Sequence, residues 1–489
     1  MPILIVVTQP KEWPLNVNGV EIVSAKSYLL DEQYSEMRGA KVFNLCRSYR
    51  YQSLGYYVSL IATARGHLPL PNVMTIQDMK SQRIVRFVSE ELDELIQKSL
   101  ETLQTRKFTL SVYFGKNIAK KYNRLAQNLF NLFPSPLLRA CFVYNNKWIL
   151  QSIDPISASE ITEEQLPFVM EVATEYFSGR RFSVPKRIPP RFEIAILYNP
   201  EEANGPSDSK AIQKFIKAAE SLDISAELIT KEDSGRLLEY DALFIRETTS
   251  VNHYTYRLAR RAAAEGLVVI DDPLSILRCS NKVYLAELLD HHRIPAPKTI
   301  IVHKDNVDSV VHELGLPVIL KQPDSTYSQG VIKITDPDEF RTEVEKLLDK
   351  SELIIAQEFV PTEFDWRVGI LDHKPLYVCK YYMVGRHWQI IKKASTGRFL
   401  EGRWETLPVE IAPKKLIRTA LHAADLIGDG LYGVDLKEID GNFTVIEVND
   451  NPTIEFGVED DILKDDLYVR IMEVFLKRIE RIKEGAFRE

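Results

Sequence analysis

An aspartate, a glutamate and an asparagine near the C-terminus form the most chemically suggestive pattern in this sequence. Two apolar, strand-like segments flank residues 440–442, whose sequence Asp-Gly-Asn is typical of a β-hairpin turn. A three-residue loop would place Asp435 directly opposite Glu447 on one face of the hairpin, with Asn449 two residues further along that face. A two-residue loop would put the two acids on opposite faces.

In the first register, two carboxylates and an amide oxygen converge with few counter-charges of their own. A hard divalent cation would neutralise such a cluster through oxygen ligands. The alternative is a solvated hairpin that carries ordinary surface acids, and this segment by itself leaves both interpretations open.

A glycine pattern in residues 428–433 matches G-x-G-x-x-G but does not indicate a dinucleotide site. That site needs a strand before the glycines and a helix after them, so that the pyrophosphate meets the helix N-terminus. Here a helix is predicted over 414–427 and a strand follows, so the glycines end a helix. The sequence also lacks G-x-x-x-x-G-K-[ST], so any nucleotide site is not a P-loop.

Lysines, apolar strands and a polar loop follow one another in the segment before this hairpin. Lys282 begins a predicted helix soon after Asp272-Pro273, and Lys321 ends an apolar strand. A small polar loop, 322–330, comes next. Two more apolar strands follow at 354–360 and 364–370. Each feature is weak by itself, because a lysine after a strand is most often a surface lysine, but their order and spacing are informative.

This arrangement resembles the ATP-grasp superfamily, specifically the RimK-like carboxylate–amine ligases, over roughly residues 193–461. The resemblance rests on a set of motifs in sequence: Asp272-Pro273 followed by Lys282, Lys321 with its loop, Gln357-Glu358-Phe359-Val360, Asp365-x-Arg367, and Gly433-Val434-Asp435 followed by Glu447-Val448-Asn449. It implies an α/β and α+β protein with an ATP-grasp fold, in which two α+β subdomains clamp ATP.

The resemblance also implies roles for individual residues. Those expected to bind the nucleotide are Lys282, Lys321, Ser325, Ser328, Gly330, Gln357, Glu358, Phe359, Val360 and Asp365. In this set the two lysines would contact phosphates, the backbone of Glu358 and Val360 would read adenine, and Asp365 would face the ribose. The expected metal ligands are Asp435, Glu447 and Asn449. The expected catalytic residues are Arg367, Lys380 and Gln389.

One basic segment bears on the expected substrates, and the sequence departs from the family pattern at two loops. Residues 380–403 carry six lysines and arginines against one acid, Glu401, which suits a triphosphate and a carboxylate substrate, although a charged surface hairpin would look the same. The phosphate-covering loop is usually glycine-rich, but here only Gly330 remains. Residues 386–389, which include Gln389, replace an arginine- and asparagine-bearing loop of the family.

The reaction that the resemblance implies is amide formation with ATP and magnesium. A carboxylate is first phosphorylated to an acyl phosphate, and an amine then displaces phosphate. Two magnesium ions are expected, with manganese as a substitute, and lysine and arginine would supply the remaining positive charge. The expected partners are an amino acid, with glutamate suggested by family analogy, and a carboxylate-bearing small molecule or a peptide or protein tail. The alternatives are an ATP-grasp kinase that phosphorylates a hydroxyl, and a nucleotide-binding scaffold whose N-terminal domain recruits a partner.

The composition of the chain limits the functions that are compatible with it. The 489 residues include 62 basic and 69 acidic side chains, for a net charge of −7, and 45% hydrophobic residues. The acidity argues against a chain that coats nucleic acid, and no apolar run approaches the ~18 residues of a membrane span. The four cysteines are far apart, which favours reduced thiols in the cytoplasm. A homo-oligomer is compatible with all of this.

Four segments are predicted along the chain. An N-terminal α/β domain covers 1–177, a basic proline-rich linker 178–191, a small parallel-sheet pre-ATP-grasp domain 192–273, and the ATP-grasp domain 274–489. The N-terminal segment, around Tyr49-Arg50-Tyr51 and Ala64-Arg65-Gly66-His67, resembles the domain that precedes ATP-grasp units in a subset of RimK-like proteins. No internal repeat of 20–50 residues stands out.

Overall fold

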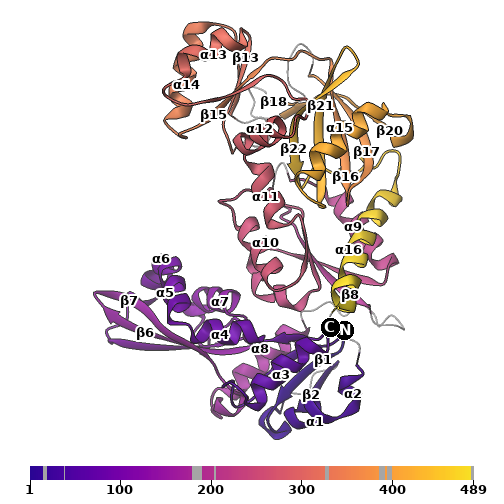
Figure 1. Ribbon diagram of the computed structural model, residues 1–489. Helices are drawn as coiled ribbons and strands as arrows, with labels where there is room; N and C mark the ends of the chain where they lie inside the picture. The colour runs from indigo at the N-terminus through magenta and orange to yellow at the C-terminus, as the bar shows by residue number, and fades with distance from the viewer. Residues whose placement is uncertain are drawn as a thin grey trace. The chain divides into compact units, whose positions relative to one another are not determined.

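A computed structural model describes residues 1–14, 19–37, 39–178, 190–202, 205–324, 330–384, 391–393 and 399–485. Ser325, Ser328, Gln389 and most of the expected linker lie outside these ranges. The chain divides into two compact units. Unit 1 contains Met1–Ala195, Asp223–Asp241 and Arg478–Glu489, and unit 2 contains Ile196–Leu222 and Ala242–Lys477. Figure 1 shows the chain coloured from indigo to yellow.

Unit 1 begins with a parallel sheet in the order β2-β1-β3-β4. Its strands are β1 (Ile3–Val7), β2 (Val20–Ser24), β3 (Lys41–Asn44) and β4 (Leu68–Leu70). Both β1 and β3 are buried along their whole length, as expected for a parallel sheet that is covered on both faces. The helices of this part are α1 (Ala25–Leu30), α2 (Glu32–Ser35), α3 (Leu54–Ala64), α4 (Val73–Lys80), α5 (Gln82–Glu91) and α6 (Asp93–Leu100).

An antiparallel sheet in the order β5-β6-β7 follows. The elements are β5 (Lys107–Tyr113), α7 (Asn123–Leu132), β6 (Leu137–Asn145), β7 (Lys147–Pro155) and α8 (Leu166–Ser178). Asn146 has a φ of 62° between β6 and β7, as expected for a residue in a tight hairpin turn. One hydrophobic core contains residues of both sheets of unit 1, including Ile5 and Phe142.

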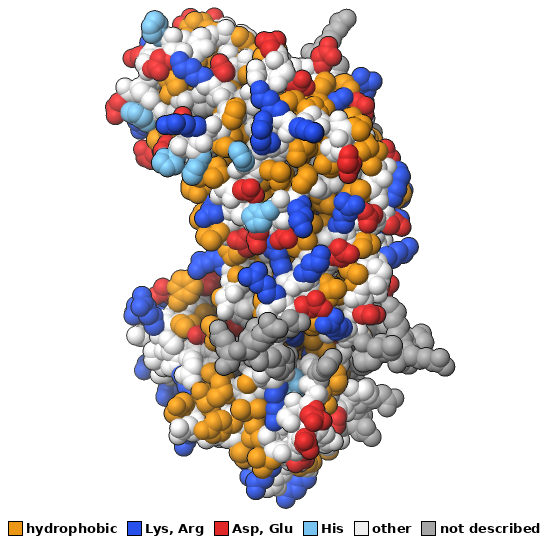
Figure 2. Space-filling model, turned by 45° about the vertical axis from the view of Figure 1, so that its right-hand side comes forward, with side chains coloured by type: hydrophobic (Ala, Val, Ile, Leu, Met, Phe, Trp, Pro, Cys, Tyr) orange, Lys and Arg blue, Asp and Glu red, His pale blue; other side chains and the backbone are white. Residues whose placement is uncertain are grey.

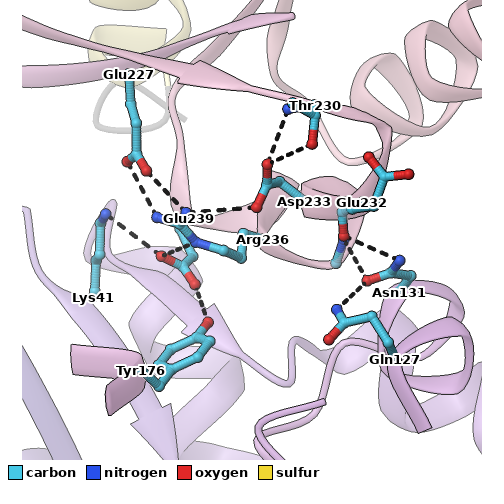
Figure 3. Close-up of polar contacts among 11 residues, drawn as sticks. Lys41, Gln127, Asn131, Tyr176, Glu227, Thr230, Glu232, Asp233, Arg236 and Glu239 are labelled. Carbon is cyan, nitrogen blue, oxygen red and sulfur yellow. Dashed lines mark hydrogen bonds and ion pairs between the residues drawn. The ribbon is translucent and has the colours of Figure 1, made fainter. Parts of the chain in front are cut away.

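Residues 223–241 also belong to unit 1, through β9 (Ile224–Ile229) and the 3-10 helix η4 (Lys231–Glu239). Figure 3 shows how buried charges hold them. The Glu239 carboxylate lies 3.7 Å from Lys41 Nζ and 3.8 Å from Arg236 Nε, and it accepts a hydrogen bond from the Tyr176 hydroxyl. Arg236 also donates to both oxygens of Glu227, at 2.8 and 3.1 Å.

The other end of η4 is tied to α7 by amides. Asn131 Nδ2 donates to the Glu232 carbonyl at 3.3 Å, and Asn131 Oδ1 accepts from Gln127 Nε2 at 2.9 Å. Asn131 Oδ1 also accepts from the Gly235 N–H at 3.2 Å. A Cβ at Gly235 would lie 2.6 Å from Asn131 Oδ1, so the approach of η4 to α7 requires a glycine.

Unit 2 opens with the strands of a small sheet whose order is β11-β10-β8-β9, in which β10 and β11 pair in parallel. Its elements are β8 (Phe192–Leu197), α9 (Ser209–Ser221), β10 (Ala242–Ile245), α10 (Tyr254–Ala264), β11 (Val268–Ile270) and α11 (Pro273–Ser280). The unit boundary falls within β8, after Ala195.

A four-stranded antiparallel sheet forms the first ATP-grasp-like subdomain, in the order β12-β15-β13-β14. Its elements are α12 (Lys282–His291), β12 (Thr299–Val302), α13 (Val307–Leu314), β13 (Val318–Lys321), β14 (Val331–Ile334), α14 (Pro337–Leu348) and β15 (Ile354–Glu358). Apolar side chains of α13 and α14 pack on the strands around Val318 and Ala356, which leaves the other face of the sheet for a site.

A five-stranded antiparallel sheet forms the second subdomain, in the order β20-β17-β16-β21-β22. Its elements are β16 (Phe364–Leu371), β17 (Lys374–Tyr382), β20 (Trp404–Leu407), α15 (Lys414–Asp425), β21 (Leu431–Ile439) and β22 (Asn442–Asp450), with β18 (Ile391–Lys393) paired separately to β19 (Phe399–Glu401). α15 covers one face through Leu416 and Ala420, and α16 (Asp465–Gly485) ends the described chain. The glycines before β21 thus follow a helix, which confirms the exclusion of a dinucleotide fingerprint.

No helix in the described part of the chain is long and apolar enough to cross a membrane. On the face drawn in Figure 2, Lys and Arg side chains are interspersed with Asp and Glu side chains. This mixture agrees with the small net charge of −7.

The buried ion pairs of Lys41 generate a stability prediction. Its side chain is 5% exposed, and its Nζ lies 2.6 Å from Glu193 Oε2 as well as 3.7 Å from Glu239 Oε2. We expect Lys41→Met to lower the free energy of unfolding by about 3 kcal/mol, because the buried Glu239 carboxylate and the half-buried Glu193 carboxylate lose a counter-charge. Urea denaturation of the full chain measures this.

The matched control is Arg86→Met, which removes an exposed ion pair with Glu90. Exposed pairs contribute little, so this variant should unfold close to the wild-type urea midpoint. Equal midpoints for the two variants would contradict the importance of the buried network.

Candidate active site

The hairpin of β21 and β22 brings Asp435 and Glu447 face to face, but by a different route from the one predicted. Ile439 pairs with Asn442, so the loop has two residues rather than three. A bulge then offsets the strands: Leu436 pairs with Val445, whereas Asp435 pairs with Glu447. The three-residue loop was therefore wrong, and the pairing of the acids was right.

The extra residue of this bulge is Ile446. A bulge inserts one residue into one strand, which re-aims the side chains beyond it. Without it, the two-residue turn would send the Glu447 side chain to the face away from Asp435. Ile446 and Glu447 both line the same cleft.

Both acids have cationic partners from other elements. Arg367 of β16 donates to both oxygens of Asp435, from Nε at 2.7 Å and from Nη2 at 2.8 Å. Lys282, at the start of α12, places Nζ 2.9 Å from Glu447 Oε1. The expectation of few counter-charges is corrected: the hairpin itself supplies few, but the neighbouring elements supply an arginine and a lysine.

This pairing shapes the pKa values of the site. Burial alone would raise the pKa of Glu447, but Lys282 and Lys321 reverse this and lower it. Burial raises the pKa of Asp435, and Arg367 opposes that rise. Burial would also lower the pKa of Arg367, but Asp435 raises it well above its ordinary value, so the guanidinium keeps its charge.

Asn449 completes the oxygen set on this face. Its Nδ2 donates to Asp435 Oδ2 at 3.1 Å. Within the described residues, no group of three or more His, Cys, Asp or Glu side chains could hold a metal by itself. Two carboxylates and an amide oxygen are instead the type of partial ligand set that Mg²⁺ uses together with waters and substrate phosphates. The residues therefore fit a nucleotide-bound magnesium ion and not an all-protein metal cage.

Lys321 lies at the end of β13, on the facing subdomain. Its Nζ donates to Gln357 Oε1 at 2.8 Å, and Gln357 Nε2 donates to Thr299 Oγ1 at 2.9 Å. Burial lowers the pKa of Lys321 to about 8, with Glu447 opposing this change and Lys282 adding to it. A buried ammonium with a lowered pKa has much to gain from a nearby anion.

The hinge residues 357–360 line the cleft beside Lys321. The Glu358 N–H donates to the Lys298 carbonyl at 2.9 Å, and the Glu358 side chain accepts from the Lys298 N–H at 2.8 Å. Lys333 Nζ lies 3.6 Å from the centroid of the Phe359 ring. Any contact of the Glu358 backbone with a base would therefore use its carbonyl oxygen.

Asp365 faces the same cleft with a partner that the sequence reasoning missed. Lys437 Nζ donates to Asp365 Oδ1 at 2.5 Å and to Thr362 Oγ1 at 2.7 Å. Lys437 stands two residues after Asp435 on β21, so the period of two in a strand was the available signal. The cleft thus contains four cations: Lys282, Lys321, Arg367 and Lys437.

The structure does not bring Lys380 into this group. Lys380 pairs with Trp366 across β16 and β17, whereas Cys379 pairs with Arg367. Alternation therefore puts the Lys380 side chain on the sheet face opposite Arg367. There its Nζ lies 5.0 Å from the Trp366 ring centroid and 3.4 Å from Glu405 Oε2. The expected catalytic role of Lys380 is not supported by its placement.

Gly330 precedes β14 with a φ of 77°. A Cβ there would lie 2.8 Å from Gln322 Oε1, and the Gly330 carbonyl accepts from the Gln322 N–H at 3.1 Å. The glycine is therefore required by the backbone turn that closes the polar loop.

The hairpin acids, Asn449, Asp365, the four cations and residues 357–360 line one cleft of about 300 Å³ within unit 2, whereas Gly330 and Lys380 do not line it. Its walls come from both subdomains and from the loops around Pro206 and Thr248. The sequence reasoning did not single out several residues that also line it: Thr248, Thr249, Tyr381, Asp450 and Glu459. Only Tyr381 had a signal, because it pairs with Asp365 across the sheet.

A second set of acids lies at the end of β22 and beyond it. Thr249 Oγ1 donates to Asp450 Oδ2 at 2.7 Å, and burial raises the pKa of Asp450 to about 8. Glu459 is buried and accepts a hydrogen bond from the Tyr381 hydroxyl. The cleft is therefore cationic around the hairpin acids and acidic beside Thr249 and Tyr381.

A fully buried arginine fixes the end of β22. Arg246, which follows β10, donates from Nη1 to Asn451 Oδ1 at 2.8 Å and from Nη2 to the Pro452 carbonyl at 2.9 Å. Asn451 Nδ2 donates in turn to the Glu247 carbonyl at 2.6 Å. These contacts hold the acid-bearing strand against the loop that carries Thr249.

Two subdomains of antiparallel sheet that face a cleft with this charge pattern define an ATP-grasp protein. Residues 279–474 match the family model described as the RimK-like ATP-grasp domain, and residues 25–172 match the one described as the RimK-like ATPgrasp N-terminal domain. The two matches together cover more than half of the 489 residues. The chain belongs to the RimK-like ATP-grasp family, which confirms the resemblance of both its parts.

Individual proteins are similar to parts of this chain. A probable alpha-L-glutamate ligase of Vibrio vulnificus is 26% identical over 235 residues, which cover 47% of this chain and 74% of the relative. An alpha-aminoadipate–LysW ligase, LysX, of Saccharolobus solfataricus is 28% identical over 200 residues, 38% of this chain and 67% of its own length. A solved RimK domain ATP-grasp protein of Sphaerobacter thermophilus has 17% identity and a TM-score of 0.44, covering 58% of this chain and 99% of its own.

The pairing of Arg367 with Asp435 generates a prediction about metal binding without nucleotide. In the wild type the guanidinium occupies both Asp435 oxygens, so Mg²⁺ alone should raise the melting temperature little. In Arg367→Met, Asp435 loses its paired cation while Glu447 keeps Lys282, and Mg²⁺ should then raise the melting temperature clearly. A calorimetric scan with and without Mg²⁺ measures this. An equal response of both proteins would contradict the metal assignment.

Proposed function

We propose that this protein is an ATP- and magnesium-dependent carboxylate–amine ligase that forms an amide bond through an acyl phosphate. The observation that carries the proposal is the cleft, where four cations stand beside two paired carboxylates and an amide. Such a site suits a polyanion that arrives with divalent metal. The ligase names of the relatives support amide formation over simple phosphoryl transfer to a hydroxyl.

In this proposal the nucleotide spans the two subdomains. Lys282 and Lys321 contact its phosphates, since both are buried ammonium groups at the cleft. The Glu358 carbonyl and the Val360 backbone bind adenine, and Asp365 faces the ribose. Lys380 has no part in it because its side chain lies on the other face of the sheet. Gln389, Ser325 and Ser328 lie outside the described residues, so their roles stay predictions.

Binding of metal and ATP would exchange the ion pairs of the hairpin. Asp435, Glu447 and Asn449 would hold Mg²⁺, with two ions as the proposed number and Mn²⁺ as a substitute. When bound, the metal neutralises phosphate oxygens and polarises the terminal phosphoryl group. Arg367 and Lys282 would then leave their carboxylates and donate to phosphate oxygens, which lie within the same cleft.

The reaction balances in two displacements. A substrate carboxylate oxygen attacks the γ-phosphorus, the bond to the β,γ-bridging oxygen breaks, and ADP leaves. The amine nitrogen then attacks the acyl carbon, and the acyl C–O bond to phosphate breaks with loss of one proton from nitrogen. In this proposal Arg367 would stabilise the oxyanion and the departing phosphate, since its raised pKa keeps the guanidinium charged.

The acidic end of the cleft suits the amine substrate. Asp450 and Glu459 line it without a lysine or arginine in hydrogen-bonding contact among the described residues, and Tyr381 lies between Glu459 and Arg367. An ammonium group that entered this end would lower the raised pKa values of the two carboxyl groups and pair with them before it loses its proton. The names of the two relatives favour an acidic amino acid such as glutamate, joined to a small molecule or to a peptide or protein tail.

Substitution of the paired acids tests the metal and ATP assignment. We expect Asp435→Asn and Glu447→Gln each to lower ADP formation by about a hundredfold or more, because charge neutralisation at the phosphates is lost. Coupled-enzyme measurement of ADP with ATP, Mg²⁺ and amino acids reads this out. Asp440→Asn at the turn of the same hairpin is the matched control and should keep wild-type turnover. Wild-type turnover in Asp435→Asn would contradict the assignment of Asp435 as a metal ligand.

The lowered pKa of Lys321 gives a pH prediction. With a pKa of about 8, Lys321 is mostly protonated at pH 7 and mostly neutral at pH 9. Phosphate contact favours the protonated form, so ATP affinity should fall by about tenfold between these pH values. Lys321→Arg keeps its charge and should show a flatter profile. Calorimetric titration measures both, and a flat wild-type profile would contradict phosphate contact by Lys321.

A trapping experiment separates the ligase from its rivals. Hydroxylamine attacks an acyl phosphate to give a hydroxamate, which a kinase acting on a hydroxyl cannot form. We expect ATP-dependent hydroxamate in the presence of a glutamate-ended peptide, detected by mass. ADP formation with a stable phosphorylated product would instead identify a kinase, and ATP binding without ADP formation under any substrate would identify a scaffold.

A further inference from the structure

The N-terminal parallel-sheet region repeats the architecture that precedes the ATP-grasp subdomains. At an offset of 200 residues, four consecutive elements correspond: α3 (Leu54–Ala64) to α10 (Tyr254–Ala264), β4 (Leu68–Leu70) to β11 (Val268–Ile270), α4 (Val73–Lys80) to α11 (Pro273–Ser280), and α5 (Gln82–Glu91) to α12 (Lys282–His291). Each begins and ends at the same offset. The sheets also share one order, with β2-β1-β3-β4 matching β9-β8-β10-β11.

Local details of the two copies agree as well. Asn72 caps α4 as Asp272 caps α11, and Ser81 caps α5 as Asn281 caps α12. Left-handed glycines end α3 and α10, at Gly66 and Gly266. The sequence search for periods of 20–50 residues could not find a repeat with this spacing, and few side chains are shared between the copies.

In the second copy, one edge of this architecture belongs to the cleft. Thr248 and Thr249, in the loop after β10, line it together with Cys279, Ser280 and Lys282 at the junction of α11 and α12. This is the carboxyl edge of the parallel strands, where open α/β sheets bind ligands at the point of strand-order reversal.

The same edge of the first copy is a rigidly held loop, residues 45–53. The Arg47 N–H donates to Thr8 Oγ1 at 3.0 Å, and Lys80 Nζ donates to the Tyr49 carbonyl at 2.9 Å. A Cβ on Gly55 would lie 2.4 Å from the Ser48 carbonyl oxygen, so α3 packs directly on the loop. The contact of Lys80 with Tyr49 joins the loop to the α4–α5 junction, as in the second copy.

Charge distinguishes the two copies. Residues 41–88 contain seven lysines and arginines and one acid, whereas the equivalent residues 241–288 contain six of each. In a chain with a net charge of −7, this local excess of six positive charges is unusual. Arg50 and Arg83 are exposed, and neither pairs with an acid among the described residues.

Exposed aromatic and aliphatic groups accompany these charges. Tyr51 is 69% exposed, and its ring centroid lies 5.2 Å from that of Tyr56. Leu54, Tyr57 and Leu60 are also exposed along α3. Large apolar side chains beside exposed arginines are typical of peptide-binding surfaces, where aromatic residues and arginine provide most of the binding energy.

We propose that this surface, the basic edge formed by Arg47, Arg50, Tyr51, Lys80 and Arg83, binds an acidic peptide segment of the acceptor. The identity of the occupant rests on the proposed function, because a ligase that adds glutamate produces or extends an acidic segment. Charge complementarity favours such a segment, and the preorganised loop reduces the entropy lost on binding. The basic edge thus corresponds to the edge of the second copy that lines the cleft. It differs in charge, because the second copy is neutral and the first is cationic.

A peptide-binding measurement on the full chain tests this proposal. Fluorescence anisotropy compares a labelled hexaglutamate peptide with a hexaglutamine peptide, without ATP. We expect binding of hexaglutamate and no binding of hexaglutamine. The double substitution Arg50→Ala and Arg83→Ala should weaken hexaglutamate binding by about tenfold or more, whereas Arg50→Lys with Arg83→Lys should retain most of it.

The matched control replaces two exposed arginines of the other part of unit 1, Arg106→Ala with Arg124→Ala, and should bind as the wild type. Equal affinity of the two peptides would overturn the proposal, as would equal weakening in the control. Tighter binding of a single-stranded oligonucleotide than of hexaglutamate, lost in the Arg50 and Arg83 variant, would overturn it in favour of a nucleic-acid surface.

These outcomes are separable from those of the proposed function. Asp435→Asn should bind hexaglutamate as the wild type does, because unit 1 carries the basic edge. Peptide binding in a protein that forms no hydroxamate would support the basic edge as a peptide-binding surface and contradict the ligase function. Hydroxamate formation without peptide binding would support the ligase function and contradict the peptide-binding surface.

Discussion

Charge pairing between buried cations and the carboxylates of β21 and β22 is the constraint on which the rest of the site depends. Asp435 and Glu447 are brought together by strand pairing, and isolated buried carboxylates would be strongly destabilising. Arg367 and Lys282 balance them. The same cations are the groups that a nucleotide's phosphates would attract, so in the proposed mechanism the resting protein pairs its phosphate-binding groups with its metal-binding groups. Metal and nucleotide together would then replace both pairs at once, and neither would do so efficiently without the other.

Much of this arrangement could be predicted from the sequence. The order of Lys282, Lys321, Asp365-x-Arg367 and the hairpin acids indicated the family, because each residue stands at the end or on one face of a strand or helix whose period is visible. The pairing of Asp435 with Glu447 was also predicted. The bulge at Ile446 that produces this pairing was not predicted, because a bulge leaves no signature in the pattern of apolar residues. The prediction used a three-residue turn instead, whereas the turn has two residues.

Other features depend on tertiary placement that no local pattern encodes. Lys380 belongs to a basic segment, but its strand position turns it to the opposite face from Arg367, and segment charge carries no information about faces. Asp450, Glu459 and Thr249 come from three places in the chain and meet only in the folded cleft. The repeat of the N-terminal region was hidden for a similar reason: its copies share hydrogen-bonded caps and strand order, but few side chains, and the charge of one copy has diverged.

The most direct test of the central claim follows one oxygen atom. A glutamate-ended peptide whose terminal carboxylate carries oxygen-18 is incubated with ATP, Mg²⁺ and glutamate, and the released phosphate is analysed by mass. An acyl phosphate transfers one carboxylate oxygen to phosphorus, so the account predicts inorganic phosphate with a single oxygen-18 atom and an amide product in equal amount. Unlabelled phosphate released at the rate of amide formation would contradict it.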